Sequence, residues 1–159
     1  MFLHYTNAEL KIENIIDKTN HQDNSKIKPV GLWVSYNDEW KKWCEKEGFS
    51  TCDMGNCNIY KLDLVEDAIL KIDTLENFCK TYEFSRTEMC HFNSIRINWV
   101  SLCRKYQGLI VLNYEKIKKE LREKYSFEVA LEEFCWFFSL DVSSGCIWNP
   151  KCIKGIEKL

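Results

Sequence analysis

A short apolar run near the C-terminus, Cys146-Ile147-Trp148, is followed at once by Asn149-Pro150. Proline has no N–H to donate to a sheet ladder, so the run predicts a strand that ends here. Beyond it, Ile153 and Ile156 are spaced to pack back onto the body of the protein. Such a terminal strand either only closes a core or begins beside a functional site, and earlier segments of the chain bear on that choice.

Short strand patterns and helical patterns follow one another along the chain. The clearest strand pattern is 58–64, where apolar and polar residues alternate strictly. Asn37 is expected to cap a helix that carries Trp40, Trp43 and Cys44 on one face and ends at Gly48. Further strands are expected at 2–6, 30–35, 68–72, 109–112 and 146–148, and further helices at 75–82, 98–106, 114–125 and 127–138.

Local signals mark the ends of these helices. Asp73-Thr74 is expected to cap the helix that follows it, Asn98 is expected to begin the next helix, and Gly108 is expected to terminate that helix. Strands of such uneven separation favour an α+β fold over a regular parallel sheet. With 159 residues, of which 45% are hydrophobic, the chain is expected to form a single domain over 1–159.

The charge pattern and the termini narrow the functional classes. A formal charge of −2 without any block of like charges gives no bulk signal for nucleic acid and is compatible only with a local groove. No run of 18 apolar residues exists, so no membrane contact is expected. The N-terminus lacks the basic and long apolar segments of a signal peptide. We therefore expect a cytoplasmic protein.

Nine cysteines are scattered along the chain, mostly at positions on apolar faces. In a cytosolic protein they are expected to be reduced, which predicts nine free thiols and no structural disulfide. Cys52, Cys57 and the pair Cys90-His91 lack the paired short spacings of a zinc ribbon or finger, so no metal site is predicted. The chain also lacks the glycine fingerprint of dinucleotide folds and a phosphate-binding loop with lysine. Any nucleotide must therefore be held in another way.

Two N-terminal strands and the tail together carry a family resemblance. Leu3-His4-Tyr5-Thr6 is a strand with a histidine before a small polar residue, and Gly31-Leu32-Trp33-Val34-Ser35 is a strand with a central aromatic residue. With 58–74, 98–112 and 146–150 in the same order, the chain resembles the ADP-ribosyltransferase superfamily. Its members include diphtheria-toxin-like toxins, poly(ADP-ribose) polymerases, DNA-modifying bacterial toxins and tRNA 2′-phosphotransferases. The resemblance implies two small mixed sheets around an NAD-binding cleft, with peripheral helices.

The resemblance also implies roles for residues of the first two motifs. His4 would bond a ribose hydroxyl of NAD, and the backbone of Tyr5 would hold the nicotinamide carboxamide. Trp33 or Tyr36 would pack on the nicotinamide ring. Ser35 would lie near the ribose, and Thr6 completes the cofactor-binding set as the small polar residue of its motif. NAD is then the co-substrate, and a macromolecule, either protein or nucleic acid, is the acceptor of ADP-ribose.

The start of the last strand departs from the family pattern. Most members carry a glutamate there, whose charge stabilises the positive charge that develops at the anomeric carbon. In this chain Ser144 stands at that position, and the nearest acid is Asp141, three residues earlier. The candidate catalytic residues are therefore Asp141 and Ser144, with Asp141 as the substitute carboxylate.

Other interpretations of the same residues stay open at this point. The fold can serve as a non-catalytic module that binds a nucleotide or a protein, with Ser144 marking the lost acid. A phosphotransferase-like enzyme would need paired arginines, and Arg96, Arg104 and Arg122 form no matching motif. His4 can equally be a satisfied structural histidine, Trp33 a core residue and Asp141 a turn residue.

Overall fold

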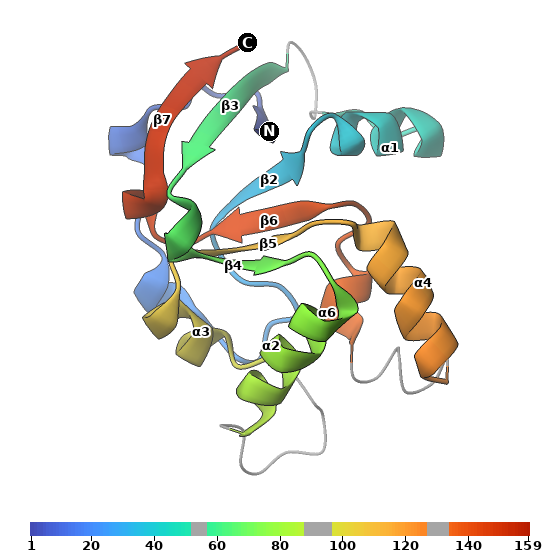
Figure 1. Cartoon of the computed structure of the whole chain (residues 1–159). Coiled ribbons are helices and arrows are strands. Elements are labelled where there is room, and N and C mark those ends of the chain that lie inside the picture. Colours follow the sequence, from blue (N-terminus) through green and yellow to red (C-terminus); the bar gives the residue numbers. More distant parts are fainter. Residues whose placement is uncertain (52–56, 88–96, 127–133) are drawn as a thin grey trace.

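Seven strands form one curled sheet in the order β4-β5-β6-β2-β1-β3-β7 in the computed structural model (Figure 1). The structure describes residues 1–51, 57–87, 97–126 and 134–159, with only the helical backbone for 82–87. Strands β4 and β5 pair in parallel, and every other described pair is antiparallel. The strands are β1 (Phe2–Thr6), β2 (Leu32–Tyr36), β3 (Asn58–Leu64), β4 (Ile69–Ile72), β5 (Gly108–Val111), β6 (Ser144–Ile147) and β7 (Ile153–Lys158).

The fold is mixed α+β as predicted, but the prediction of two separate small sheets is wrong. Strand β2 pairs with β6 on one side and with β1 on the other, so a single ladder connects both halves. The connection between the halves is short, since β1 and β2 share only the pairs Phe2–Tyr36 and Leu3–Ser35. Beyond these two pairs the strands no longer pair, and the sheet is open between its halves.

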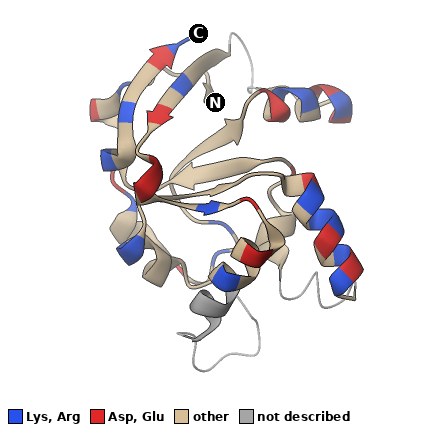
Figure 2. Cartoon of the chain, in the orientation of Figure 1, with Lys and Arg blue, Asp and Glu red and all other residues tan. Residues whose placement is uncertain are grey.

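Helices cover one face of the β4-β5-β6 half of the sheet (Figure 1). They are α2 (Leu75–Thr87), α3 (Trp99–Lys105), α4 (Tyr114–Lys124) and α6 (Cys135–Phe138). Together with the sheet they enclose the larger core, in which Trp99, Trp148 and Phe137 are fully buried. On α4 the buried residues Tyr114, Ile117 and Leu121 recur at helical spacing, and the charged residues between them, marked along the ribbon in Figure 2, are exposed or half-buried.

The other face of the sheet folds onto itself around a second core. Residues from both ends of the strand order meet there, among them Leu62 of β3, Ile153 of β7 and Ile110 of β5. The right-handed twist of strands supports this curl, which lets a sheet bury both faces without helices on each side. The remaining helix, α1 (Glu39–Glu47), follows β2 and projects away from α2, α4 and α6 (Figure 1).

Several helix ends behave as the sequence predicts. Asn98 caps α3 by accepting a hydrogen bond from Ser101 N at 3.0 Å, and Thr74 Oγ1 accepts one from Asn77 N at 3.2 Å before α2. Gly48 ends α1 with φ 75°, a left-handed conformation that glycine adopts freely. The predicted Asn37 cap is wrong, because Asn37 has φ 51° and Asp38 occupies the cap position without a side-chain bond.

Other boundaries differ from the prediction. Gly108 begins β5 instead of ending α3, whose cap residue is Tyr106. The expected helix over 127–138 is described only at α6, and residues 127–133 lie outside the described residues. Residues after Pro150 form a 3₁₀ turn, Pro150–Cys152, and then β7, a strand that the sequence did not predict and that pairs with β3.

One cysteine contradicts the prediction of nine free thiols. Cys57 is disulfide-bonded, whereas Cys44, Cys79, Cys103, Cys135, Cys146 and Cys152 are free. Cys52, Cys90 and His91 lie outside the described residues. In the described ranges, no three His, Cys, Asp or Glu side chains form a group able to hold a metal ion. No helix of the described chain has the length and apolar character needed to cross a bilayer.

Candidate functional site

A cleft of about 380 Å³ lies where β1 and β2 stop pairing. Three segments that are distant in sequence line it: residues 3–5 of β1, 33–35 of β2, and 140–142 with Ser144 in the last part of the chain. Lys28, Trp40 and Thr51 complete the lining. The volume falls in the range of about 300–1,000 Å³ that is typical of ligand-binding clefts.

At this cleft, backbone N–H and C=O groups of β1 and β2 extend beyond the last pair of the β1–β2 ladder. Met1 O accepts a hydrogen bond from Asn37 N at 2.7 Å, so odd-numbered residues of both strands direct their backbone groups across the β1–β2 border. Tyr5 and Trp33 are the next positions in this series, but the ladder ends at Leu3–Ser35. The N–H and C=O of Tyr5 and the C=O of Trp33 therefore face the gap between the strands.

His4 bridges this gap with its side chain. Its Nδ1 lies 2.7 Å from the carbonyl oxygen of Trp33. A carbonyl only accepts, so Nδ1 carries the proton and Nε2 of the neutral ring is left as an acceptor. Burial lowers the pKa of His4 below its ordinary value of 6.5, although the bond to Trp33 acts in the opposite direction. The ring is therefore neutral at physiological pH.

An aromatic ring and a cation stand together at the cleft. Trp33 is half-buried, packs against the larger core and also lines the cleft. Lys28 Nζ lies 5.5 Å from the centroid of the Trp33 ring, within the range of a cation–π contact. The lysine side chain is exposed, so its charge is available to an anionic group that enters the cleft.

Tyr5 and Ser35 form a polar pair across the same border. Burial raises the pKa of the Tyr5 hydroxyl above its ordinary value of 10.0, with the charge of Asp38 acting in the same direction and a hydrogen bond with Ser35 opposing both. Ser35 is buried, and its Oγ also donates to Asn37 O at 3.1 Å. Tyr5 therefore stays protonated, and its ring is held beside β2.

Asp141 lies at the apex of a tight turn that faces the cleft. Its φ is 66°, and Val142 N donates to Leu140 O at 2.8 Å, which is the bond of a three-residue γ-turn. Backbone conformations of this kind are strained, persist only where the surroundings fix them and cluster at functional sites. No hydrogen bond or ion pair from the described residues engages the Asp141 carboxylate, which leaves its charge available in the cleft.

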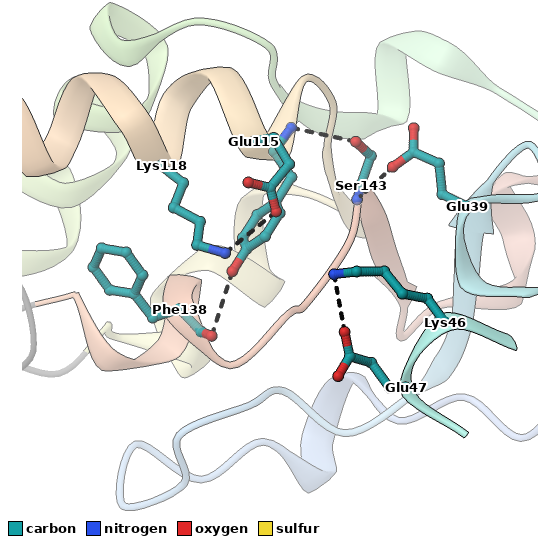
Figure 3. Close-up of polar contacts among 8 residues, drawn as sticks. Glu39, Lys46, Glu47, Glu115, Lys118, Phe138 and Ser143 are labelled. Atoms are coloured by element: carbon teal, nitrogen blue, oxygen red, sulfur yellow. Dashed lines mark hydrogen bonds and ion pairs between the residues drawn. The ribbon is translucent and has the colours of Figure 1, made fainter. Parts of the chain in front are cut away.

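Three hydrogen bonds from different elements hold Ser143, which follows the turn. Its N–H donates to Glu39 Oε2 at 3.0 Å, its Oγ accepts from Tyr114 N at 3.2 Å (Figure 3), and its carbonyl accepts from Tyr36 N at 2.8 Å. Tyr114 OH also donates to Phe138 O at 3.4 Å, on the other side of the turn (Figure 3). Residues of β2, α1 and α4 thus hold the strained turn at the cleft.

Ser144 carries a hydroxyl without a partner. The residue is only 8% exposed, and its Oγ has no hydrogen-bond partner in the described part of the chain. An unpaired buried hydroxyl costs about 1–3 kcal/mol, so such groups usually have a partner. Ser144 also lines the cleft, which makes a bound ligand a natural partner for this atom.

The cleft contains six of the eight residues singled out in the sequence: His4, Tyr5, Trp33, Ser35, Asp141 and Ser144. Thr6 and Tyr36 do not line it. Thr6 Oγ1 accepts from Ala8 N at 3.1 Å, and the ring of Tyr36 lies 5.8 Å from that of Phe2. Side chains alternate along a strand, which places Tyr36 on the opposite face of β2 from Ser35.

Sequence reasoning missed the other side chains that shape the cleft. The sequence pattern assigned no role to Lys28, and it placed Trp40 only on a helix face. Glu39 was missed as well; it accepts a hydrogen bond from the backbone N–H of Ser143. The sequence signal for Glu39 and Trp40 was their position shortly after the motif at residues 31–35.

The arrangement combines a neutral imidazole acceptor, open strand backbone, a half-buried indole, a free carboxylate and an orphan hydroxyl in one cleft. Comparisons of the chain with known protein families, curated proteins and solved structures found no match. The geometry of this cleft therefore carries the functional argument.

Proposed function

We propose that the protein is an NAD-dependent ADP-ribosyltransferase that modifies a macromolecule. The observation that carries the proposal is the meeting of three distant segments in one cleft. His4, Trp33 and Asp141 belong to separate sequence motifs, and all three line the same cleft of about 380 Å³. In this proposal NAD binds at the open β1–β2 border. In the superfamily the corresponding cleft lies between two small sheets.

The border fits the nicotinamide riboside part of NAD. The nicotinamide carboxamide has one donor and one acceptor group, which match the C=O and N–H of Tyr5 that face the gap. The Trp33 ring offers an apolar face for the nicotinamide. Nε2 of neutral His4 accepts a hydrogen bond from a ribose hydroxyl, because Nδ1 is committed to Trp33 O. Ser144 Oγ supplies a further donor.

Lys28 is suited to the pyrophosphate of NAD. It is the cation that lines the cleft among the described residues, and its exposed side chain can follow an extended ligand outwards. Because Lys28 lies over the Trp33 ring, it is already oriented towards the cleft. No helix N-terminus is needed for the phosphates in this arrangement, in agreement with the missing glycine-rich motifs.

The transfer step forms one bond and breaks one. A nucleophilic atom of the acceptor attacks the anomeric carbon of the nicotinamide ribose, and the glycosidic bond to nicotinamide breaks with its electron pair going to the leaving ring nitrogen. The nucleophile loses its proton to solvent or to Asp141. Asp141, fixed at its γ-turn, stabilises the positive charge that develops at the anomeric carbon. The products are the ADP-ribosylated acceptor, nicotinamide and a proton.

A reducing compartment suits this proposal. Six described cysteines are free, and burial raises the pKa of Cys103 to about 12 and that of Cys152 to about 11, so neither thiol reacts readily at neutral pH. We place the protein in the cytoplasm on this ground.

Incubation of the purified protein with adenine-labelled NAD and a whole-cell extract tests the proposal. The expected result is label on macromolecules together with one free nicotinamide per label, with both signals strongly reduced in Asp141→Asn. Separation of the label into protein and nucleic-acid fractions identifies the acceptor class. Tight NAD binding without any nicotinamide release would instead support a non-catalytic binding module, which the loss of the usual glutamate at Ser144 would explain.

A further inference from the structure

Glu39 differs from the other acids at the start of α1 and along it. The other acids of residues 38–47 each pair with a lysine at 3.0–3.9 Å: Asp38, Glu45 and Glu47. Glu39 joins none of these pairs. Its Oε2 instead accepts a hydrogen bond at 3.0 Å from the backbone N–H of Ser143, 104 residues away in the chain (Figure 3). This carboxylate therefore contacts the segment that carries Asp141.

The turn after β2 brings Glu39 to this place. Strand β2 stays beside the last part of the chain up to its end, where Tyr36 N donates to Ser143 O at 2.8 Å. Asn37 then takes a left-handed backbone with φ 51°, which asparagine tolerates better than most residues. Glu39 begins α1 only two residues later. The reversal at Asn37 thus places the first side chain of the helix next to the backbone of Ser143.

A second element, α4, holds the same segment from the core. Tyr114 N donates to Ser143 Oγ at 3.2 Å, and the Tyr114 hydroxyl is hydrogen-bonded to the backbone of Asp141. Tyr114 is only 1% exposed and belongs to the larger core. Helix α1, by contrast, has a single buried residue, Cys44, and Glu39 itself is half-buried. Glu39 is therefore an anchor that can be removed without opening the core.

The position of the Asp141 carboxylate depends on these anchors. Asp141 lies two residues before Ser143, at the apex of the γ-turn, with φ 66°. A strained turn of this kind persists only where the surrounding contacts fix it. A displacement of a reacting group by about 1 Å can cost about 10² in rate. The loss of an anchor at Ser143 should therefore lower the rate without removing any group that touches NAD.

We propose that Glu39 is a positioning residue, whose carboxylate fixes the turn that holds Asp141 in the cleft. Glu39 does not line the cleft, so it acts through Asp141 and not on NAD. The role in catalysis rests on the transferase function proposed above, in which the Asp141 carboxylate stabilises the charge at the anomeric carbon. The turn needs the acceptor oxygen of Glu39 and not its charge, because the contact is a single bond from a backbone N–H.

Nicotinamide release at varied NAD concentration, measured well below the unfolding midpoint, tests the proposal. Glu39→Ala should lower kcat about tenfold and leave KM for NAD nearly unchanged, because the groups that bind NAD stay in place. Glu39→Gln keeps an oxygen that accepts from Ser143 N and should restore most of kcat. Glu45→Ala is the matched control, since it also removes an acid from α1 but one that pairs with Lys41 on the helix surface.

A double variant separates positioning from a merely structural role. If Glu39 acts through Asp141, Glu39→Ala should have no further effect on kcat once Asp141→Asn is present. A structural role would lower kcat by the same factor in both backgrounds. Equal losses in both backgrounds, or an unchanged kcat of Glu39→Ala alone, overturn the proposal. A loss in Glu39→Gln as large as that in Glu39→Ala also overturns it, because the effect would then belong to the charge.

Amide hydrogen exchange at the turn keeps the test independent of turnover. In Glu39→Ala the amide protons of Val142 and Ser143 should exchange faster than in the parent, and in Glu39→Gln at nearly the parent rate. If the parent releases no nicotinamide, the transferase function is overturned, and these exchange rates alone decide whether Glu39 positions the turn. Equal exchange of Val142 and Ser143 in Glu39→Ala and the parent overturns the positioning role, whatever the activity.

Discussion

The two borders of β2 are built in different ways. Towards β6, four consecutive pairs run from Leu32–Ile147 to Ser35–Ser144. The backbones approach closely here, since a Cβ on Gly31 would lie 2.4 Å from Ile147 O. Towards β1, only two pairs form before the strands separate, and the imidazole of His4 bonds Trp33 O in place of a further ladder bond.

The difference shows how one strand serves two purposes. The β2–β6 border satisfies its backbone groups within the protein and belongs to the core of the fold. The β1–β2 border leaves backbone and polar side-chain groups unsatisfied, at a cost that a ligand can offset on binding. Substitutions on the closed border should therefore change stability, and substitutions around the open border should change ligand binding and turnover.

The largest effect is expected at Asp141, next to the open border. Asp141→Asn removes the charge but keeps the shape, and asparagine tolerates the left-handed backbone as well as aspartate does. ADP-ribose transfer should fall by about 10²–10³, the usual contribution of a preorganised electrostatic group. The unfolding midpoint should change little. Initial rates of nicotinamide release measure the effect, and Ser144→Glu tests whether the family carboxylate raises the rate. Full activity of Asp141→Asn would remove this residue from catalysis.

The closed border should respond through stability. Gly31→Ala places a Cβ against Ile147 O and the Cys146 sulfur, and such overpacking costs about 1–3 kcal/mol in the free energy of unfolding. Gly155→Ala is the matched control, because no atom lies within 4 Å of the added Cβ. Urea unfolding compares both variants with the parent. An equal stability of Gly31→Ala and Gly155→Ala would contradict the close approach of β2 and β6.

At the open border, His4→Ala should weaken NAD binding. The loss of a hydrogen bond that leaves a buried partner unpaired costs about 1–3 kcal/mol in binding free energy. Thr6→Ala serves as the control, since Thr6 is on the same strand and does not line the cleft. Calorimetric titration with NAD measures both. If His4→Ala and the parent bind NAD equally, His4 is a structural histidine and not part of the site.

The smallest expected effect is a pH dependence of NAD affinity. Only neutral His4 can accept a hydrogen bond at Nε2, and burial keeps its folded pKa below 6.5. Affinity should be constant above pH 6.5 and decline as the pH falls through the folded pKa. Stability should decline as the pH falls from 6.5 to the folded pKa, because in that range the unfolded chain binds more protons than the folded one. His4→Gln should abolish this step in affinity, and its persistence in that variant would assign it to another group.

The sequence predicted much of the fold where local patterns are strong. The alternation at 58–64 coincides with β3, and Gly48 and Asn98 act as the helix signals suggested. Strand β7 escaped prediction because Lys154, Gly155 and Glu157 make it look like a loop, and only pairing with β3 makes it a strand. The single sheet was also missed, because strand pairing across β1, β2 and β6 is set by tertiary contacts.

Several residues of the candidate site could be predicted from short sequence motifs. His4, Trp33 and Asp141 come from separate motifs and line one cleft. The strained turn at Asp141 was not visible in sequence, because aspartate is common in ordinary turns. The near-parallel packing of Trp40, Trp43 and Phe49 was missed as well, since Trp40 and Trp43 look like core residues and the position of Phe49 depends on the backbone at Gly48.

Backbone amide NMR during an NAD titration tests the central claim most directly. If NAD occupies the open border, the amide signal of Tyr5 should shift strongly, because its N–H faces the gap and gains a new acceptor. The amide signal of Ile110, buried in β5 on the other side of β6, should stay nearly unchanged. No shift of Tyr5 at saturating NAD, or shifts confined to residues outside the cleft, would contradict the account.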